Sequence, residues 1–269
     1  MIPCPLEIIV ENLSVTYSTA RLALYNASCR VEPGTITGLV GPNGGGKSTL
    51  FKAIMGFLPP TTGKIRVAGT SVQKAQKNQW MAYVPQADEV DWHFPVSVFD
   101  VVMMGRYGYM NLLRIPSPKD RRIVMESLER VGMVDFRDRQ IGELSGGQKK
   151  RAFLARALAQ EGKIILLDEP FTGVDVKTEK SIIDLLLQLR DEGHTILVST
   201  HDLGSISTFC DRTILLNRTI LAAGTTAETF TEENLVMTFG GLPLSSLPAH
   251  CSPEPQSPLG QVQNTEVEP

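Results

Sequence analysis

Nine consecutive residues combine glycines, a lysine and two hydroxyl side chains in a spacing suited to holding phosphate. They are Gly41, Pro42, Asn43, Gly44, Gly45, Gly46, Lys47, Ser48 and Thr49. Glycines let the backbone bend until successive N–H groups point into one cavity. Lys47 adds positive charge for the β- and γ-phosphates, and the Ser48 hydroxyl can ligate Mg²⁺. The spacing predicts a site for a nucleoside triphosphate with Mg²⁺.

Two adjacent carboxylates follow an apolar run at residues 164–167. In an open α/β sheet, ligands bind beyond the carboxyl ends of the strands, so Asp168 and Glu169 are expected near the phosphates. Asp168 would hold Mg²⁺ directly or through water. Glu169, one residue further, would serve as the general base that activates or orients water for phosphoryl transfer.

A second glycine-rich segment precedes a strongly helical stretch. It consists of Leu144, Ser145, Gly146, Gly147 and Gln148. Its serine and glycine amides at a helix N-terminus would form another anion site. Because the phosphates of one nucleotide do not need two cradles in one subunit, we expect this segment to serve a nucleotide bound to another subunit. If the partner is a copy of this chain, the result is a two-fold symmetric dimer around ATP.

The elements around these motifs alternate between strands and helices. Apolar and alternating runs predict strands at 8–10, 13–17, 29–33, 35–40, 64–67, 81–84, 164–167 and 196–199, and a hairpin at 213–216 and 219–222. Helices are expected at 48–57 and 177–191. Residues 88–162 carry helical periodicity at 96–104, 117–131 and 148–159 and no strand signal. The pattern predicts an α/β fold with a mainly parallel sheet and an inserted helical subdomain.

Length and composition define the class of protein. The chain has 269 residues and 26 basic against 29 acidic side chains, a net charge of −3, which argues against nucleic acid as a partner. It has no apolar run of 18 residues, no CxxC pair and no signal peptide, so we expect a cytoplasmic protein. Residues 1–241 are predicted to form the nucleotide-binding domain, and 242–269, with six prolines and no Lys or Arg, a disordered tail.

The order of these motifs resembles that of ABC transporter ATP-binding subunits. The matching segments are GPNGGGKST, Gln86 in Tyr-Val-Pro-Gln, LSGGQ, ILLDEP, Gly173-Val-Asp175 and His201. The resemblance covers about residues 6 to 240. It implies a P-loop NTPase core of the ABC ATPase type, a small antiparallel β subdomain and a helical subdomain that carries LSGGQ.

The resemblance also implies roles for four further residues. Tyr17 would stack on adenine, although a tyrosine on a sheet face would have the same pattern. Gln86 would sense Mg²⁺ and the attacking water and link the site to the helical subdomain. Asp175 would cross the dimer interface, and a helix N-cap would use the same carboxylate. His201 would contact the γ-phosphate.

Segments between the motifs resemble one particular branch of this family. Residues 88–95, 104–110, 139–151 and 168–179 resemble the manganese/iron branch of metal-ion importers, with manganese-import subunits the closest. This implies separate membrane permease subunits, an extracytoplasmic metal-binding protein that acts indirectly, and a peripheral position on the cytoplasmic face of the plasma membrane. Zinc or iron-complex import stays an alternative.

Two other classes of protein are also considered. A soluble, non-transport ABC ATPase would need paired ATP-binding units, long coiled coils or a basic surface, and a P-loop kinase or GTPase has no use for LSGGQ. Asp91 and His93 are too small a cluster to indicate a metal site.

Overall fold

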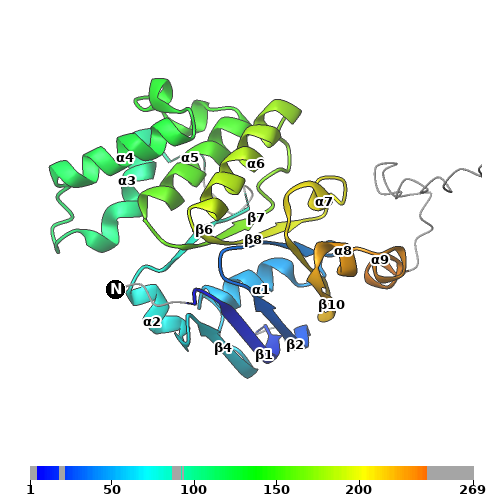
Figure 1. The fold of residues 1–269 in the computed structure, drawn as a ribbon. Helices are drawn as coiled ribbons and strands as arrows, with labels where there is room; N and C mark the ends of the chain where they lie inside the picture. Colours follow the sequence, from blue (N-terminus) through cyan, green and yellow to red (C-terminus); the bar gives the residue numbers. More distant parts are fainter. Residues whose placement is uncertain (1–4, 18–21, 87–91, 93, 241–269) are drawn as a thin grey trace, which may run out of the picture.

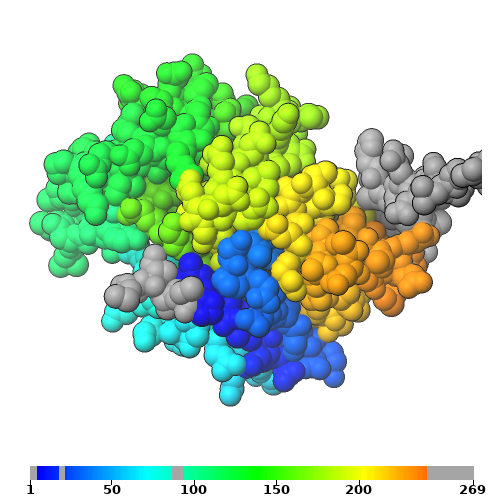
Figure 2. All heavy atoms as spheres, viewed as in Figure 1, coloured from blue at the N-terminus to red at the C-terminus, as the bar shows by residue number. Residues whose placement is uncertain are grey.

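The computed structural model describes residues 5–17, 22–86, 92 and 94–240. The predicted tail at 242–269 and the Asp91–His93 pair lie outside the described residues. Figure 1 shows two sheets and a separate group of helices, and Figure 2 shows that group as a lobe beside the rest of the molecule.

The main sheet is parallel except at one edge. Its order is β10-β9-β3-β8-β7-β6. The strands are β3 (Ile36–Val40), β6 (Met81–Val84), β7 (Ile164–Asp168), β8 (Thr195–Thr200), β9 (Arg212–Asn217) and β10 (Thr219–Thr225). Only β10 runs antiparallel, in the predicted hairpin with β9. Every residue of β3, β7 and β8 is buried, which explains why these strands are apolar on both faces.

A second, antiparallel sheet has the order β2-β1-β4-β5. Its strands are β1 (Ile8–Thr16), β2 (Leu22–Val31), β4 (Thr62–Val67) and β5 (Thr70–Ser71). The prediction of two separate strands at 8–10 and 13–17 is wrong, because β1 continues through Glu11 and Asn12. Asn12 instead has φ +50° and the pairing shifts between Val10 and Leu13, so the turn-prone residues form an irregularity within one strand.

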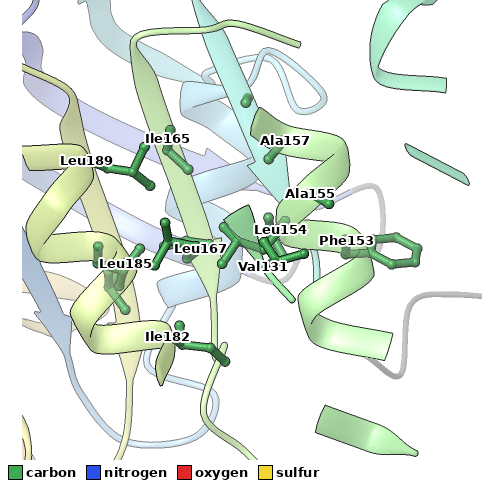
Figure 3. Packing of buried hydrophobic residues seen from close by; sticks show 14 of the residues in the cluster. Val131, Phe153, Leu154, Ala155, Ala157, Ile165, Leu167, Ile182, Leu185 and Leu189 are labelled. Carbon is green, nitrogen blue, oxygen red and sulfur yellow. The ribbon is translucent and has the colours of Figure 1, made fainter. Parts of the chain in front are cut away.

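Helices cover both faces of the main sheet. Outside the helical insertion they are α1 (Lys47–Ile54), α2 (Val72–Lys77), α6 (Val176–Asp191), α7 (Ile206–Phe209), α8 (Thr226–Thr229) and α9 (Glu232–Phe239). Alternate residues of one strand enter different cores. Leu166 of β7 packs with α1 and the antiparallel sheet. Leu167 packs with α6 and with α5 (Gly146–Ala159), in the core that Figure 3 shows. This alternation fixes the direction in which β7 ends, and therefore the position of Asp168.

The expected helical subdomain is confirmed. Between β6 and β7 the described elements are α3 (Val98–Met103), the 3₁₀ helix η2 (Met104–Tyr109), α4 (Pro118–Arg130), the short 3₁₀ turns η3 (Val134–Phe136) and η4 (Ile141–Glu143), and α5 (Gly146–Ala159). Helices α3, α4 and α5 each begin at a serine that forms a capping box. The third of these serines is Ser145, so α5 starts two residues earlier than predicted.

The helical subdomain is bonded to the main sheet at one end of α5. The Arg156 guanidinium donates to the Tyr83 carbonyl at 3.2 Å, and the Gln160 amide donates to the Met81 carbonyl at 2.6 Å. Both acceptors belong to β6. The last turn of α5 is therefore attached to the strand that leads to Gln86.

A buried arginine holds the helices of this subdomain together. Arg106 is only 2% exposed. Its Nε donates to Asp120 Oδ1 at 3.0 Å, and its Nη1 donates to the Ala159 carbonyl at 2.8 Å and to Glu161 Oε2 at 2.6 Å. The Tyr109 ring lies 4.1 Å from the guanidinium carbon. One side chain thus links η2, the start of α4 and the end of α5.

Candidate functional site

A cavity of about 470 Å³ opens where the glycine-rich loop meets both sheets. It is lined by Tyr17, Leu22, Ala23, Asn43, Gly44, Gly46, Lys47, Ser48, Thr49, Gln86, Glu169 and Arg218. Most of the predicted phosphate loop therefore faces one cavity. Gln86 and Glu169, from the ends of β6 and β7, lie at the same cavity, as expected for the carboxyl ends of neighbouring parallel strands.

The loop conformation depends on its glycines. Gly44 and Gly46 have φ +76° and +101°, which side chains rarely adopt, and Gly46 immediately precedes α1. A Cβ atom at Gly41 would overlap the Leu216 carbonyl oxygen of β9. Gly45 donates to the Pro42 carbonyl at 3.0 Å. The loop thus packs directly on β9 and leaves the N-terminus of α1 open to the cavity, where the helix dipole favours an anion.

Lys47 is buried at the base of the loop. Its Nζ donates to the Gly41 carbonyl at 2.9 Å and the Pro42 carbonyl at 3.3 Å, and lies 3.8 Å from Glu169 Oε1. Burial lowers the pKa of Lys47, while the charges of Glu169 and Asp168 act in the opposite direction. The ammonium group is thus held by neutral carbonyls beside carboxylates, and the oxygens of a phosphate would be stronger acceptors.

Ser199 of β8 positions both predicted carboxylates. Its hydroxyl donates to Asp168 Oδ1 at 2.5 Å and accepts the Glu169 N–H at 3.0 Å. Asp168 is 1% exposed. Glu169 has φ +50°, an uncommon conformation for a residue with a side chain, and Thr172 donates to its Oε2 at 3.1 Å. The sequence analysis placed Ser199 in a strand and did not identify this role, because the bonds cross between strands.

His201 lies next to the cavity through Glu169, whereas Tyr17 lines the cavity itself. His201 Nδ1 lies 3.3 Å from Glu169 Oε1, and its side chain is 45% exposed. Tyr17 follows β1, lines the cavity and shares a hydrogen bond of 3.1 Å with Thr49 Oγ1. The structure therefore brings Gln86, Glu169 and Tyr17 to one cavity and places His201 beside Glu169.

The second glycine-rich segment lies apart from this cavity, and none of residues 144–148 lines it. Ser145 accepts the Gln148 N–H and Gln148 bonds back to the Ser145 N–H at 2.9 Å. Gly147 packs against Thr178, at the start of α6. Asp175 caps α6 by accepting from the N–H and hydroxyl of Thr178, which lowers the pKa of Asp175. The N-cap alternative for Asp175 is thus present in the structure.

Two basic residues near the site were missed from the sequence. Lys150 of α5 donates to the carbonyls of Glu169 and Thr172 at 2.8 and 2.5 Å, which ties the helical subdomain to the segment after β7. Arg218 lies at the turn between β9 and β10 and lines the cavity. The sequence showed a helix and a hairpin turn at these positions, and neither pattern indicates which distant loop will be adjacent.

The sheet order, the glycine loop after β3 and the carboxylates after β7 define a P-loop nucleotide-binding protein. The chain belongs to the ABC transporter family, whose signature matches residues 24–172. This confirms the resemblance seen in the sequence.

Three relatives indicate the branch of the family. The chain is 82% identical to the manganese transport system ATP-binding protein MntA of Synechocystis over 90% of this chain and 93% of that protein. It is 62% identical to the chelated iron transport system membrane protein YfeB of Yersinia pestis, over 88% and 80% of the two chains. It is 45% identical to the zinc transport system ATP-binding protein TroB of Treponema pallidum, over 88% of each.

Two solved structures share the fold. An inward-facing metal-chelate type ABC transporter has a TM-score of 0.76 and 31% identity, covering 87% of this chain and 88% of that one. The dimeric post-hydrolysis state of the cassette MJ0796, bound to ADP and Pi, has a TM-score of 0.71 and 27% identity, covering 81% and 98%. Within the described part of the chain, no helix combines the length and apolarity needed to cross a membrane.

Proposed function

We propose that this chain is the ATP-hydrolysing subunit that powers import of a transition-metal ion, manganese, through separate membrane subunits. We choose manganese because the chain is 82% identical to a manganese transport ATP-binding protein over nearly the whole of both chains. The relatives named for chelated iron and zinc are less similar, so these metals are the alternatives that the experiment must separate.

The cavity fits ATP with Mg²⁺. Ser48 supplies a hydroxyl, Asp168 a buried carboxylate and Gln86 an amide, and oxygen ligands of these kinds suit a hard divalent cation. Bound there, Mg²⁺ would neutralise charge on the β- and γ-phosphate oxygens. Lys47 would exchange its loop carbonyls for phosphate oxygens, and Tyr17 would cover the adenine at the other end.

Hydrolysis would use Glu169 as the general base. Its carboxylate takes a proton from water while the water oxygen attacks the γ-phosphorus and the bond to the β–γ bridging oxygen breaks, giving ADP and phosphate. His201, 3.3 Å from Glu169, would hold the carboxylate and contact the γ-phosphate. Gln86 would orient the water from the end of β6.

A homodimer would supply the missing phosphate contacts. The LSGGQ segment does not line the cavity of its own chain, so it would complete the site of a partner copy. The related cassette MJ0796 is dimeric with ADP and Pi bound, which supports this arrangement. ATP would bind the closed dimer more tightly than ADP does, so closure follows binding and reopening follows hydrolysis.

The permease would dock on the helical subdomain. Six large exposed apolar side chains lie there within a short stretch: Phe94, Tyr107, Tyr109, Leu112, Leu113 and Ile115. Their exposed fractions reach 98% at Leu112. Exposed apolar side chains concentrated in one segment favour a protein contact there. The subunit would therefore sit on the cytoplasmic face of the membrane, and the extracytoplasmic metal-binding protein would act on it only through the permease.

Two measurements test the proposal. Light scattering on purified Glu169→Gln protein should show a monomer without nucleotide and a dimer with ATP, because hydrolysis is blocked. Tight ATP binding without dimerisation would refute the self-paired arrangement. In cells that lack the protein, manganese uptake should be restored by the wild-type chain and not by Glu169→Gln. Restored uptake of zinc or iron alone would overturn the choice of metal.

A further inference from the structure

Arg218 is a cationic side chain at the nucleotide cavity to which no motif assigns a role. It lines the cavity together with the phosphate loop, although it comes from the distant turn between β9 and β10. Its side chain is exposed. Within the described ranges, its guanidinium forms no hydrogen bond or ion pair with a protein group. A cation left without an anionic partner beside a phosphate site is available for a ligand.

The backbone of Arg218 is fixed to the phosphate loop. Its N–H donates to the Gly45 carbonyl at 2.7 Å, and its carbonyl accepts the Tyr25 N–H of β2 at 2.8 Å. Its φ is +59°, which turns the hairpin at this residue. Strands β2 and β10 are also in contact, as Figure 1 shows near α1. The turn, the loop and β2 therefore meet at one point, and the guanidinium starts from a defined position.

The position along the cavity indicates which part of a nucleotide Arg218 would reach. The γ-phosphate end is defined by Lys47 and Glu169, which lie 3.8 Å apart. Among the other lining residues, Leu22 and Ala23 belong to β2 of the antiparallel sheet and Tyr17 directly follows β1. Arg218 is bonded to the same strand β2. Arg218 thus belongs to the base end of the cavity, where the α-phosphate joins the ribose.

The charged residues that line the cavity support the same placement of Arg218. Lys47 and Arg218 are the cationic residues among those that line the cavity, and Glu169 is an acidic one. Lys47 acts at the β- and γ-phosphates. The α-phosphate has no cation from the motif residues, and a guanidinium is well suited to two phosphate oxygens.

We propose that Arg218 binds the α-phosphate and is a positioning residue for the nucleotide. The proposal rests on the proposed ATP site and adds a contact to it. Because ATP and ADP share the α-phosphate, Arg218 would contribute equally to the affinity for both. It would therefore set nucleotide affinity without favouring the closed dimer, unlike groups at the γ-phosphate.

Isothermal titration of ATP and ADP, with Mg²⁺, onto the wild-type chain and four full-length variants tests this inference. Arg218→Gln removes the charge, Arg218→Gly keeps the backbone conformation without a side chain, and Arg218→Lys keeps the charge. Arg66→Gln is the matched control, an exposed arginine on β4 paired with Glu11 at 2.7 Å. We expect Kd to rise about tenfold for both nucleotides in the Gln and Gly variants. The Lys variant should recover part of the loss, and the control should bind like wild type.

Thermal unfolding without nucleotide separates binding from folding, because the Gly variant should melt at the wild-type temperature. Wild-type affinity in Arg218→Gln would overturn the inference and leave the ATP site intact. A loss for ATP alone would overturn the placement at the α-phosphate. Failure of the wild-type chain to bind ATP would instead refute the proposed function.

Discussion

Replacing Arg106 by methionine should destabilise the protein strongly. The methionine fills similar volume but leaves Asp120 Oδ1 and the Ala159 carbonyl without their donor. Removing one partner of a buried ion pair typically costs about 3–5 kcal/mol. The lower end, about 3 kcal/mol, applies here for two reasons. Asp120 keeps two bonds from Ser117, at 2.6 and 2.9 Å, and Glu161 is half-exposed and can turn to water.

The assay is urea unfolding followed by tryptophan fluorescence. Trp80 is buried in the core beneath the antiparallel sheet, and Trp92 packs on Phe153 in the helical subdomain. Single-tryptophan proteins should report the same loss, because the core of the helical subdomain includes residues of the main sheet, and the same sheet packs on its other face against the core that contains Trp80. A loss of about 3 kcal/mol would lower Tm by roughly 10 °C for a domain of this size.

The matched control is Arg122→Met on the surface of α4. Arg122 pairs with Glu126 at 3.5 Å and both side chains are more than 60% exposed, so the loss should stay below about 1 kcal/mol. An Arg106 variant no less stable than this control would refute the reasoning. It would show that burial and three hydrogen bonds do not make Arg106 a structural centre of the helical subdomain.

Three further predictions follow from buried polar groups. Ser199→Ala should lower steady-state ATP hydrolysis at least about tenfold with nucleotide affinity nearly unchanged, because the Asp168 carboxylate and the Glu169 N–H lose the hydroxyl that positions them. Ser127→Ala, which removes another buried hydroxyl, should have no effect. Burial lowers the pKa of His194, so the unfolded chain takes up the proton first and the free energy of unfolding should fall as pH drops below about 6.5. Urea titrations should show that fall and its loss in His194→Gln, at no more than about 1.4 kcal/mol per pH unit. Desolvation raises the pKa of the half-buried Cys29 to about 12, and burial raises the pKa of Cys210 as well. Maleimide should therefore label both thiols slowly in the folded protein at pH 7.5, and rapid labelling would contradict the raised pKa values.

The sequence predicted the motifs better than the contacts that support them. The loop at 41–49 and the carboxylates at the end of β7 could be placed because strand–turn–helix patterns are local and parallel strands end at one edge. Gln86 was identified through the resemblance to the ABC family. The helical insertion could also be predicted, because the apolar residues of 88–162 recur with the period of a helix. The short helices α2, α7, α8 and α9 were not predicted, since they have few residues and depend on packing against the sheets.

The missed site residues share one property. Ser199, Lys150 and Arg218 act on residues that lie far from them in the chain, and each has an ordinary local environment of a strand, a helix or a turn. Asn12 illustrates the opposite error. Its preference for a turn-like backbone is real, but the structure uses that backbone for an irregularity inside β1 and not for a turn between strands. In both cases long-range pairing decided the outcome.

The bonds from Arg156 and Gln160 to β6 would let α5 act as a lever with its pivot at the C-terminal end once the Lys150 bonds to the Glu169 and Thr172 carbonyls are released. The helix has 14 residues, so its two ends lie about 21 Å apart. A rigid rotation of about 15° around that pivot would move LSGGQ by roughly 5 Å while the last turn stays beside β6. A small rotation of α5 near Gln86 would thus become a larger displacement at the opposite end of the helix. That end carries LSGGQ, which would contact the nucleotide of a partner subunit. Shortening α5 by one turn would reduce the reach of this stroke without touching any residue of the cavity.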